Sequence, residues 1–172
     1  MATMTHNQIS EAEQRAGPLW VSGDLSITIS RSRFTDLNAV GQLQRRCFRR
    51  SLAYRFPTLW MLHVWPKTTF LVARAGESIV GSVIGDIQGG QSRVVSICVD
   101  PEWRRHGIGA MLLAEIEGYV PAGNMILMVE SENVIAQQLY RQTGYIVVGE
   151  SADYYGRGRN GVWMQKTRRS TE

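Results

Sequence analysis

The sequence lacks several features that would place it in a membrane, secreted or metal-binding class. Its 172 residues contain no apolar run of about 18 residues, the length that a membrane-spanning helix requires. Residues 1–17 are polar and have no apolar stretch typical of a secretory signal. The two cysteines, Cys47 and Cys98, show no metal-ligand spacing and lie in apolar segments typical of buried thiols. We therefore expect a cytoplasmic protein with no metal and no membrane partner.

Two common phosphate-binding motifs are also missing. No Lys-Ser or Lys-Thr pair follows Gly107 and Gly109, which excludes a Walker A loop at these glycines. The same segment has Leu112 where the dinucleotide fingerprint requires its third glycine. That fingerprint also begins directly after a strand, whereas here the residues "DPEWRRH" intervene.

The composition is that of one globular domain with a basic surface. The net charge is +4, carried mainly by arginine, whose planar guanidinium suits phosphate and carboxylate partners. The densest cluster is "RRCFRR" at 45–50, which a helix would place on one side. It is either a solvated helix face or a basic rim for an acidic partner. Because aromatic residues do not alternate with these arginines, we expect no nucleic-acid partner.

Hydrophobic periodicity and turn residues predict an alternating α/β chain. Strands are expected at 25–33, 68–73, 78–87, 94–99, 125–130, 145–149 and 162–166. Helices are expected from Thr35 or Asp36 to about Arg50, from Thr58, after Gly107 to about Tyr119, and over 133–143. We expect a disordered N-terminal arm over 1–24, a single domain over 25–168, and a tail over 169–172.

The joint between the strand 94–99 and the next helix carries the clearest functional signal. Gly107 and Gly109 stand in the first turn of that helix, where unpaired backbone N–H groups and the helix dipole favour an anion. Glycines there leave room for an anion to approach the backbone closely. A pyrophosphate site is one interpretation, and a plain glycine-bearing turn is the other.

The segment "RRHGIG", residues 104–109, resembles the Arg/Gln-x-x-Gly-x-Gly/Ala signature of the GCN5-related N-acetyltransferase (GNAT) superfamily. The preceding "SICVDPEW" and the later "SENVIAQQLYRQTGYIVVGESADYYG" resemble that family's other motifs, in the same order. Within it, the pairs Leu139-Tyr140 and Tyr154-Tyr155 are similar to those of the ribosomal-protein-alanine N-terminal acetyltransferase branch. The resemblance implies an α/β (α+β) GNAT fold. Its mixed central sheet would have about six to seven strands, a splayed central pair and about four flanking helices.

The resemblance also implies acetyl-CoA as cosubstrate and supplies candidate site residues. The cofactor-binding candidates are Ile97, Cys98, Val99, Arg104, Arg105, His106, Gly107, Ile108, Gly109, Ala110, Asn133 and Tyr140. The backbone N–H of Val99 would face the acetyl carbonyl, and Asn133 would contact pantetheine or simply cap a helix. Tyr140 would be the general acid that protonates the leaving thiolate, unless it is only a core aromatic. Acceptor-binding candidates are Tyr54, Phe56, Tyr154 and Tyr155.

One departure from the family pattern concerns the general base. The branch has a glutamate five residues before its asparagine, and here that position is Met128, which cannot take a proton. Glu130 projects from the same face of the strand and is the candidate replacement. Otherwise water could deprotonate an α-amine, whose pKa is about 8.

We therefore expect an N-acetyltransferase that moves an acetyl group from acetyl-CoA to a primary amine, with a protein or peptide N-terminus as the favoured acceptor. The alternatives are a small-molecule amine acetyltransferase and a non-catalytic acyl-CoA-binding sensor. The sequence leaves monomer and homodimer open.

Overall fold

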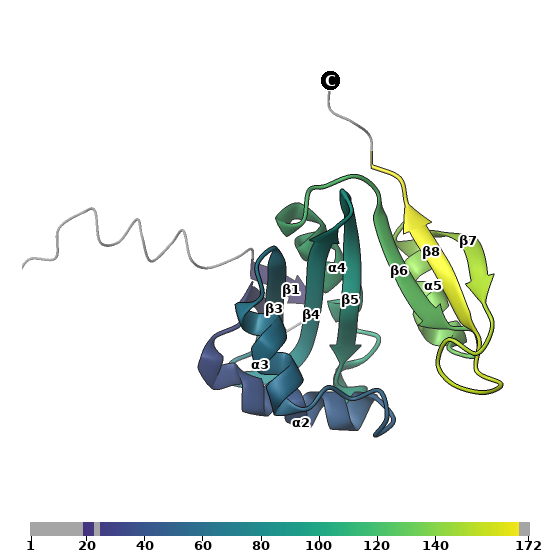
Figure 1. Ribbon diagram of the computed structural model, residues 1–172. Helices are drawn as coiled ribbons and strands as arrows, with labels where there is room; N and C mark the ends of the chain where they lie inside the picture. The colour runs from purple at the N-terminus through teal and green to yellow at the C-terminus, as the bar shows by residue number, and fades with distance from the viewer. Residues whose placement is uncertain (1–18, 23–24, 169–172) are drawn as a thin grey trace, which may run out of the picture.

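The computed structural model describes residues 19–22 and 25–168 (Figure 1). In chain order its elements are β1 (Leu19–Ser22), β2 (Leu25–Arg31), the 3-10 helix η1 (Phe34–Asp36), α2 (Leu37–Cys47), α3 (Phe56–Val64), β3 (Thr68–Ala75), β4 (Ser78–Gln88), β5 (Gln91–Val99), η2 (Pro101–Trp103), α4 (Ile108–Tyr119), β6 (Met125–Glu130), α5 (Val134–Gln142), β7 (Ile146–Ser151) and β8 (Gly161–Lys166). No helix within the described residues is both long and apolar enough to cross a bilayer.

In the described part of the chain, eight strands form one mixed sheet in the order β1-β2-β3-β4-β5-β6-β8-β7. The first five strands follow chain order as antiparallel neighbours. Gly89 and Gly90, both with positive φ, allow the tight turn between β4 and β5. β6 is parallel to β5 because α4 carries the chain back between them, and β8 lies between β6 and β7, antiparallel to both.

Helices cover both faces of the sheet (Figure 1). The periodic apolar residues of α4, such as Leu112 and Ile116, are fully buried in one core, which also contains Tyr140 of α5. Val40 of α2 and Leu59 of α3 belong to a second core on the opposite face. The sheet therefore separates the start of α4 from the loop that joins α2 and α3.

The splayed central pair expected from the family resemblance is confirmed. β5 and β6 are paired only where Ser92–Val94 face Met125–Leu127. Beyond Val94 and Leu127 the two strands diverge, which Figure 1 shows as an opening toward their C-terminal ends. This opening, called the gap below, is bounded by residues 95–99 of β5 and 128–130 of β6.

The structure differs from the sequence-based expectations in three places. Residues 19–22, assigned to the arm, pair with β2 as an eighth strand, while residues 1–18, 23–24 and 169–172 lie outside the described residues. α2 ends at Cys47, so Arg49 and Arg50 follow the helix and the arginine cluster is not one helix face. α3 begins at Phe56 rather than Thr58, because Pro57 fits the first turn of a helix.

Candidate active site

The backbone of β5 presents free donors to the gap. The N–H of Asp100 donates to the Val80 carbonyl of β4 at 2.9 Å. Because successive N–H groups of a strand point to opposite sides, the N–H of Val99 and that of Ile97 turn away from β4, toward the gap. The N–H of Cys98 faces β4 instead. Of the three predicted β5 residues, Ile97 and Val99 thus offer amides, and Cys98 does not.

The start of α4 is the candidate anion-binding end. Met111 is the first residue whose N–H bonds back along the chain, to the Gly107 carbonyl at 3.0 Å. The N–H groups of Ile108, Gly109 and Ala110 precede it and have no acceptor within the helix. Gly107 is left-handed, at φ 77°, and the residue after it is helical. Where a left-handed residue adjoins a helical or extended one, successive N–H groups point into the same concavity. Ile108 can contribute only its backbone, because its side chain is buried in the core.

The two glycines are small for different reasons. Gly107 caps α4 in the left-handed conformation, and a Cβ there would meet no other atom within 4 Å. A Cβ at Gly109 would lie 2.9 Å from Cδ2 of Leu139, so this glycine allows α4 and α5 to approach each other. The left-handed backbone therefore explains Gly107 and interhelical packing explains Gly109, while access for an anion stays a prediction.

Three exposed cationic or titratable side chains precede this helix. Arg104 donates from Nε to the Val99 carbonyl at 3.3 Å, which links the α4 approach to the end of β5. The ring of His106 lies 6.4 Å from that of Trp103, and Arg105 holds a positive φ of 66°. All three residues are exposed and lie within four residues before the first residue of α4.

Asn133 and Tyr140 lie at the two ends of α5. The Oδ1 atom of Asn133 accepts a hydrogen bond from the Ala136 N–H at 3.1 Å. Asn133 therefore caps α5, which is one of the two roles expected for it from the sequence. Tyr140 is 6% exposed and its ring lies 5.8 Å from that of Tyr145. Burial, and to a lesser degree Tyr155, raises the pKa of Tyr140, which keeps the phenol protonated. Its hydroxyl makes no hydrogen bond to any residue that the structure describes.

The structure argues against Glu130 as the base. Arg159 forms a bidentate ion pair with the Glu130 carboxylate: its Nε donates to Oε1 at 2.6 Å, and its second nitrogen donates to Oε2 at 2.9 Å. The hydrogen bond from Arg159 is the main cause that lowers the pKa of Glu130, and the charge of Arg49 adds to it. A carboxylate held in this way is a weak base.

Two of the four predicted acceptor residues, Tyr154 and Tyr155, come together beside the gap. Tyr155 donates from its hydroxyl to the Met128 carbonyl of β6 at 3.0 Å, and its ring lies 5.0 Å from that of Tyr154. Tyr54 lies in the α2–α3 loop, and burial raises its pKa, with a smaller contribution from Tyr154. Burial and the neighbouring Tyr154 and Glu130 raise the pKa of Tyr155 to about 12.

Phe56 does not join this group. Its ring packs edge-on against Phe34, with 6.1 Å between centroids, at the first turn of α3. The family resemblance placed Phe56 with Tyr54 in one acceptor loop, because α3 was expected to begin at Thr58. In the structure Tyr54 packs against the second core, whereas Phe56 is 40% exposed at the start of the helix.

Sequence reasoning missed two polar supports of this region. Gln44 of α2 is fully buried; it donates to the Ser96 hydroxyl at 3.2 Å and accepts the Tyr54 N–H at 3.5 Å. Its signal was a polar residue among the apolar positions of an amphipathic helix. Arg93 and Asp86 form a bidentate ion pair across the β4–β5 hairpin, with two guanidinium nitrogens of Arg93 at 2.8 and 2.6 Å from the two carboxylate oxygens of Asp86. The Gly-Gly turn, which sets the register, could have revealed that pair.

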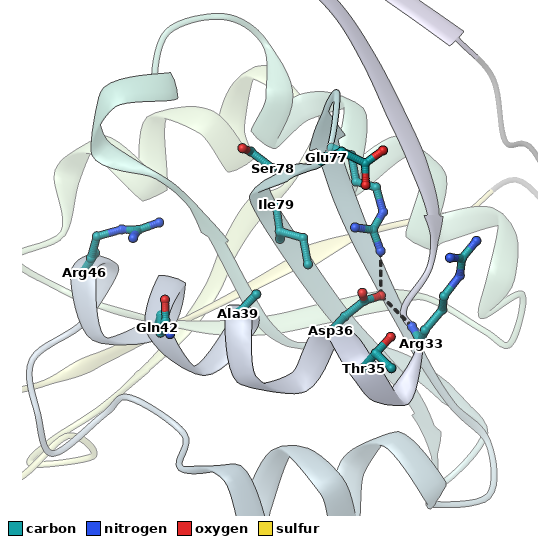
Figure 2. A pocket seen from close by; sticks show the side chains of 10 residues that line it. Arg33, Thr35, Asp36, Ala39, Gln42, Arg46, Glu77, Ser78 and Ile79 are labelled. Atoms are coloured by element: carbon teal, nitrogen blue, oxygen red, sulfur yellow. Dashed lines mark hydrogen bonds and ion pairs between the residues drawn. The ribbon is translucent and has the colours of Figure 1, made fainter.

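A shallow polar hollow of about 490 Å³ lies elsewhere, beside α2 and the β3–β4 turn (Figure 2). Asp36 on its wall accepts hydrogen bonds from Arg74 at 2.6 Å and from the Arg33 N–H at 2.7 Å. None of the predicted site residues lines it. We therefore assign the site to the gap, where free amides and tyrosines converge.

Comparisons with known proteins identify the family of this chain. Residues 37–145 match the acetyltransferase (GNAT) family. An uncharacterised N-acetyltransferase of Methanocaldococcus jannaschii is 30% identical over 137 residues, which span 76% of this chain and 85% of the relative. The N-alpha-acetyltransferase RimI of Mycobacterium tuberculosis is 34% identical over 94 residues, spanning 52% of this chain and 60% of that protein.

A solved structure shows the same fold. The ribosomal-protein-alanine N-acetyltransferase of Escherichia coli superposes with a TM-score of 0.72, covering 85% of this chain and 98% of the other. The two sequences are 19% identical, so this likeness concerns the fold alone.

Proposed function

Since the chain belongs to the GNAT family of acetyltransferases, we propose that it transfers the acetyl group of acetyl-CoA to the α-amine of a protein or peptide N-terminus. The observation that carries the proposal is the convergence on one gap of free β5 amides, an anion-binding helix end and a group of tyrosines. Relatives that include an N-alpha-acetyltransferase support the choice of a terminal amine.

The residues on the α4 side of the sheet fit acetyl-CoA. The N–H groups of Ile108, Gly109 and Ala110 would bind its diphosphate, and the exposed Arg104 and Arg105 would add positive charge. The N–H of Ile97 would bind the pantetheine chain, with Asn133 facing it from α5. The N–H of Val99 would hold the acetyl carbonyl and stabilise the negative charge that develops on its oxygen.

Tyr140 would supply the proton that the departing thiolate needs. Because its pKa is raised by burial, the phenol carries that proton throughout the neutral range. The amine needs no base within the described residues if it enters uncharged. With a pKa of about 8, an α-amino group is partly neutral at physiological pH, whereas a lysine side chain is not. This difference favours N-termini as acceptors.

The acceptor would lie among the tyrosines on the α2–α3 side. Tyr54, Tyr154 and Tyr155 offer rings and hydroxyls to a peptide backbone. Arg159 is neutralised by Glu130, whereas Arg49, Arg55 and Arg157 make no ion pair with the described residues. Those three arginines would favour an acceptor with acidic residues after its first position.

The test is acetylation of paired peptides followed by mass spectrometry. Peptides with a small first residue and a following Asp or Glu should react on the α-amine and release free CoA. Matched peptides with Lys at the following position should react more slowly, and added salt should narrow the difference. Acetylation restricted to polyamines, aminoglycosides or lysine side chains would contradict the proposed acceptor class. If no acceptor in the full panel caused release of CoA, the proposed acetyl-transfer activity would itself be contradicted.

A further inference from the structure

The fold brings the thiols of the two cysteines in the sequence together. Cys47 ends α2 and Cys98 lies in β5. Gln44, about one turn before Cys47, donates to the Ser96 hydroxyl, and Ser96 lies two residues before Cys98 on the same face of the strand, so both cysteine side chains lie between α2 and β5. Cys98 is buried, with its Sγ 3.3 Å from the Ser82 hydroxyl. Cys47 is partly exposed and donates from its thiol to the Val99 carbonyl at 3.3 Å. Both are free thiols.

The surroundings of the two thiols shift their pKa values in opposite directions. The neighbouring Cys98 side chain is the main cause that lowers the pKa of Cys47, and the positive charge of Arg104 adds to it. The Cys47 side chain, together with burial, raises the pKa of Cys98. The exposed member of the pair therefore has the greater thiolate fraction, and the buried member is positioned as its partner.

The pair lies on the strand end assigned to the acetyl carbonyl. Cys98 and Val99 share one peptide group, and its N–H is the one that faces the gap. The next carbonyl, that of Val99, accepts hydrogen bonds from both Cys47 and Arg104. A covalent change at the two sulfurs would therefore act directly on this peptide and on the segment that leads to α4.

We propose that Cys47 and Cys98 form a peroxide-sensitive pair whose oxidation to a disulfide stops acetyl transfer; its effect on transfer rests on the function proposed above. The thiolate of Cys47 attacks one oxygen of a hydroperoxide, and the O–O bond breaks. This step leaves a sulfenic acid on Cys47, and the other oxygen departs as water or an alcohol after taking a proton.

The sulfur of Cys98 then attacks the sulfenic sulfur. An S–S bond forms, the S–O bond breaks, and the oxygen leaves as water with the proton of Cys98. The two thiols lose two electrons in total and the peroxide gains them. In the product the sulfurs are about 2.0 Å apart, closer than any hydrogen-bonded pair. Cys47 also loses the proton that it donates to Val99, so the end of β5 must shift.

The experiment treats the full chain with hydrogen peroxide and follows thiols and activity separately. Thiol labelling and peptide mass mapping should show both thiols lost, the two cysteine peptides linked, and the mass reduced by two hydrogens. Non-reducing electrophoresis should show a monomer. Acetyl transfer should fall on the order of 10²-fold, the loss expected when reacting groups are displaced by about 1 Å, and dithiothreitol should restore it.

Cys47→Ser is the matched control because its hydroxyl can still donate to the Val99 carbonyl. Its buried Cys98 thiol should survive the peroxide treatment, and its transfer rate should be the same before and after. In Cys98→Ser, used for thiol chemistry only, the oxidation of Cys47 should stop at a sulfenic acid that a 1,3-dicarbonyl reagent traps.

Two results would overturn the proposal. The first is wild-type protein in which Cys47 is oxidised beyond the sulfenic acid while the Cys98 thiol stays free. The second is a complete disulfide with an unchanged transfer rate. If the reduced protein transfers no acetyl group, the proposed function is wrong, yet the mass map still decides the disulfide. Calorimetric affinity for CoA, measured with and without the disulfide, then decides whether the disulfide acts on the gap.

Discussion

Tyr140 combines a buried ring with a hydroxyl that no described residue engages. Tyr140→Phe should therefore leave stability nearly unchanged and lower kcat about 10²-fold or more, the usual contribution of a general acid. Acetyl-CoA affinity should stay the same, because only an interaction with the departing thiolate is lost. Steady-state kinetics and calorimetry measure kcat and the affinity.

Tyr145→Phe is the control, since the Tyr145 hydroxyl donates to the Glu117 carboxylate at 3.2 Å and its loss should not affect the rate. A near-wild-type rate for Tyr140→Phe would make Tyr140 a core residue only.

Glu130 leads to the opposite expectation for the rate. Because Arg159 already holds its carboxylate, Glu130→Gln should slow transfer by less than the 10²-fold that loss of a general base costs. The folded state lowers the pKa of Glu130, so the ion pair stabilises the fold above the ordinary carboxyl pKa. The stability difference between wild type and Glu130→Gln should thus shrink as pH falls below that value. Urea unfolding across pH measures it, and a 10²-fold slower variant would restore Glu130 as the base.

At the scale of elements, Gly107 and Gly109 should respond differently to alanine. Gly107→Ala places a side chain at φ 77°, which costs roughly 1–2 kcal/mol in backbone strain. Gly109→Ala presses on Leu139 of α5, an overpacking that costs about 1–3 kcal/mol. Denaturant unfolding should show that Leu139→Ala removes most of the penalty of Gly109→Ala and none of that of Gly107→Ala. Equal penalties in both backgrounds would mean that Leu139 does not explain Gly109.

The elements that the sequence predicts correctly are those specified by near neighbours in the chain. The strand 94–99, Gly107 and the periodic residues that follow define the β5–α4 joint within about two dozen residues. The ion pair of Glu130 and Arg159 joins positions 29 residues apart, and it depends on how β6 meets the β7–β8 loop. Propensity contains no information on such a pairing, so sequence reasoning assigned Glu130 a free carboxylate.

For the whole molecule, the sequence predicts the helices and the central strands better than it predicts the edge strand of the sheet. Seven strands and four helices follow from periodicity, whereas β1 is a four-residue strand after a polar segment and pairs only with β2. The predicted gap is present because β5 and β6 share only three residue pairs. Helix α4 lies on one face of the sheet and the α2–α3 loop on the other, so a donor and an acceptor can approach the gap from opposite faces.

The strand order also has a consequence for synthesis of the chain. Strands β1 to β5 lie in the sheet in the order in which a ribosome makes them, so each can pair with the strand made just before it. β6 differs from these strands, because its antiparallel neighbour β8 is synthesised only after α5 and β7. During translation the N-terminal five strands can thus be complete while the far wall of the gap is still missing. In the nascent protein, β6 therefore bounds the gap without its antiparallel neighbour until the last strand is inserted.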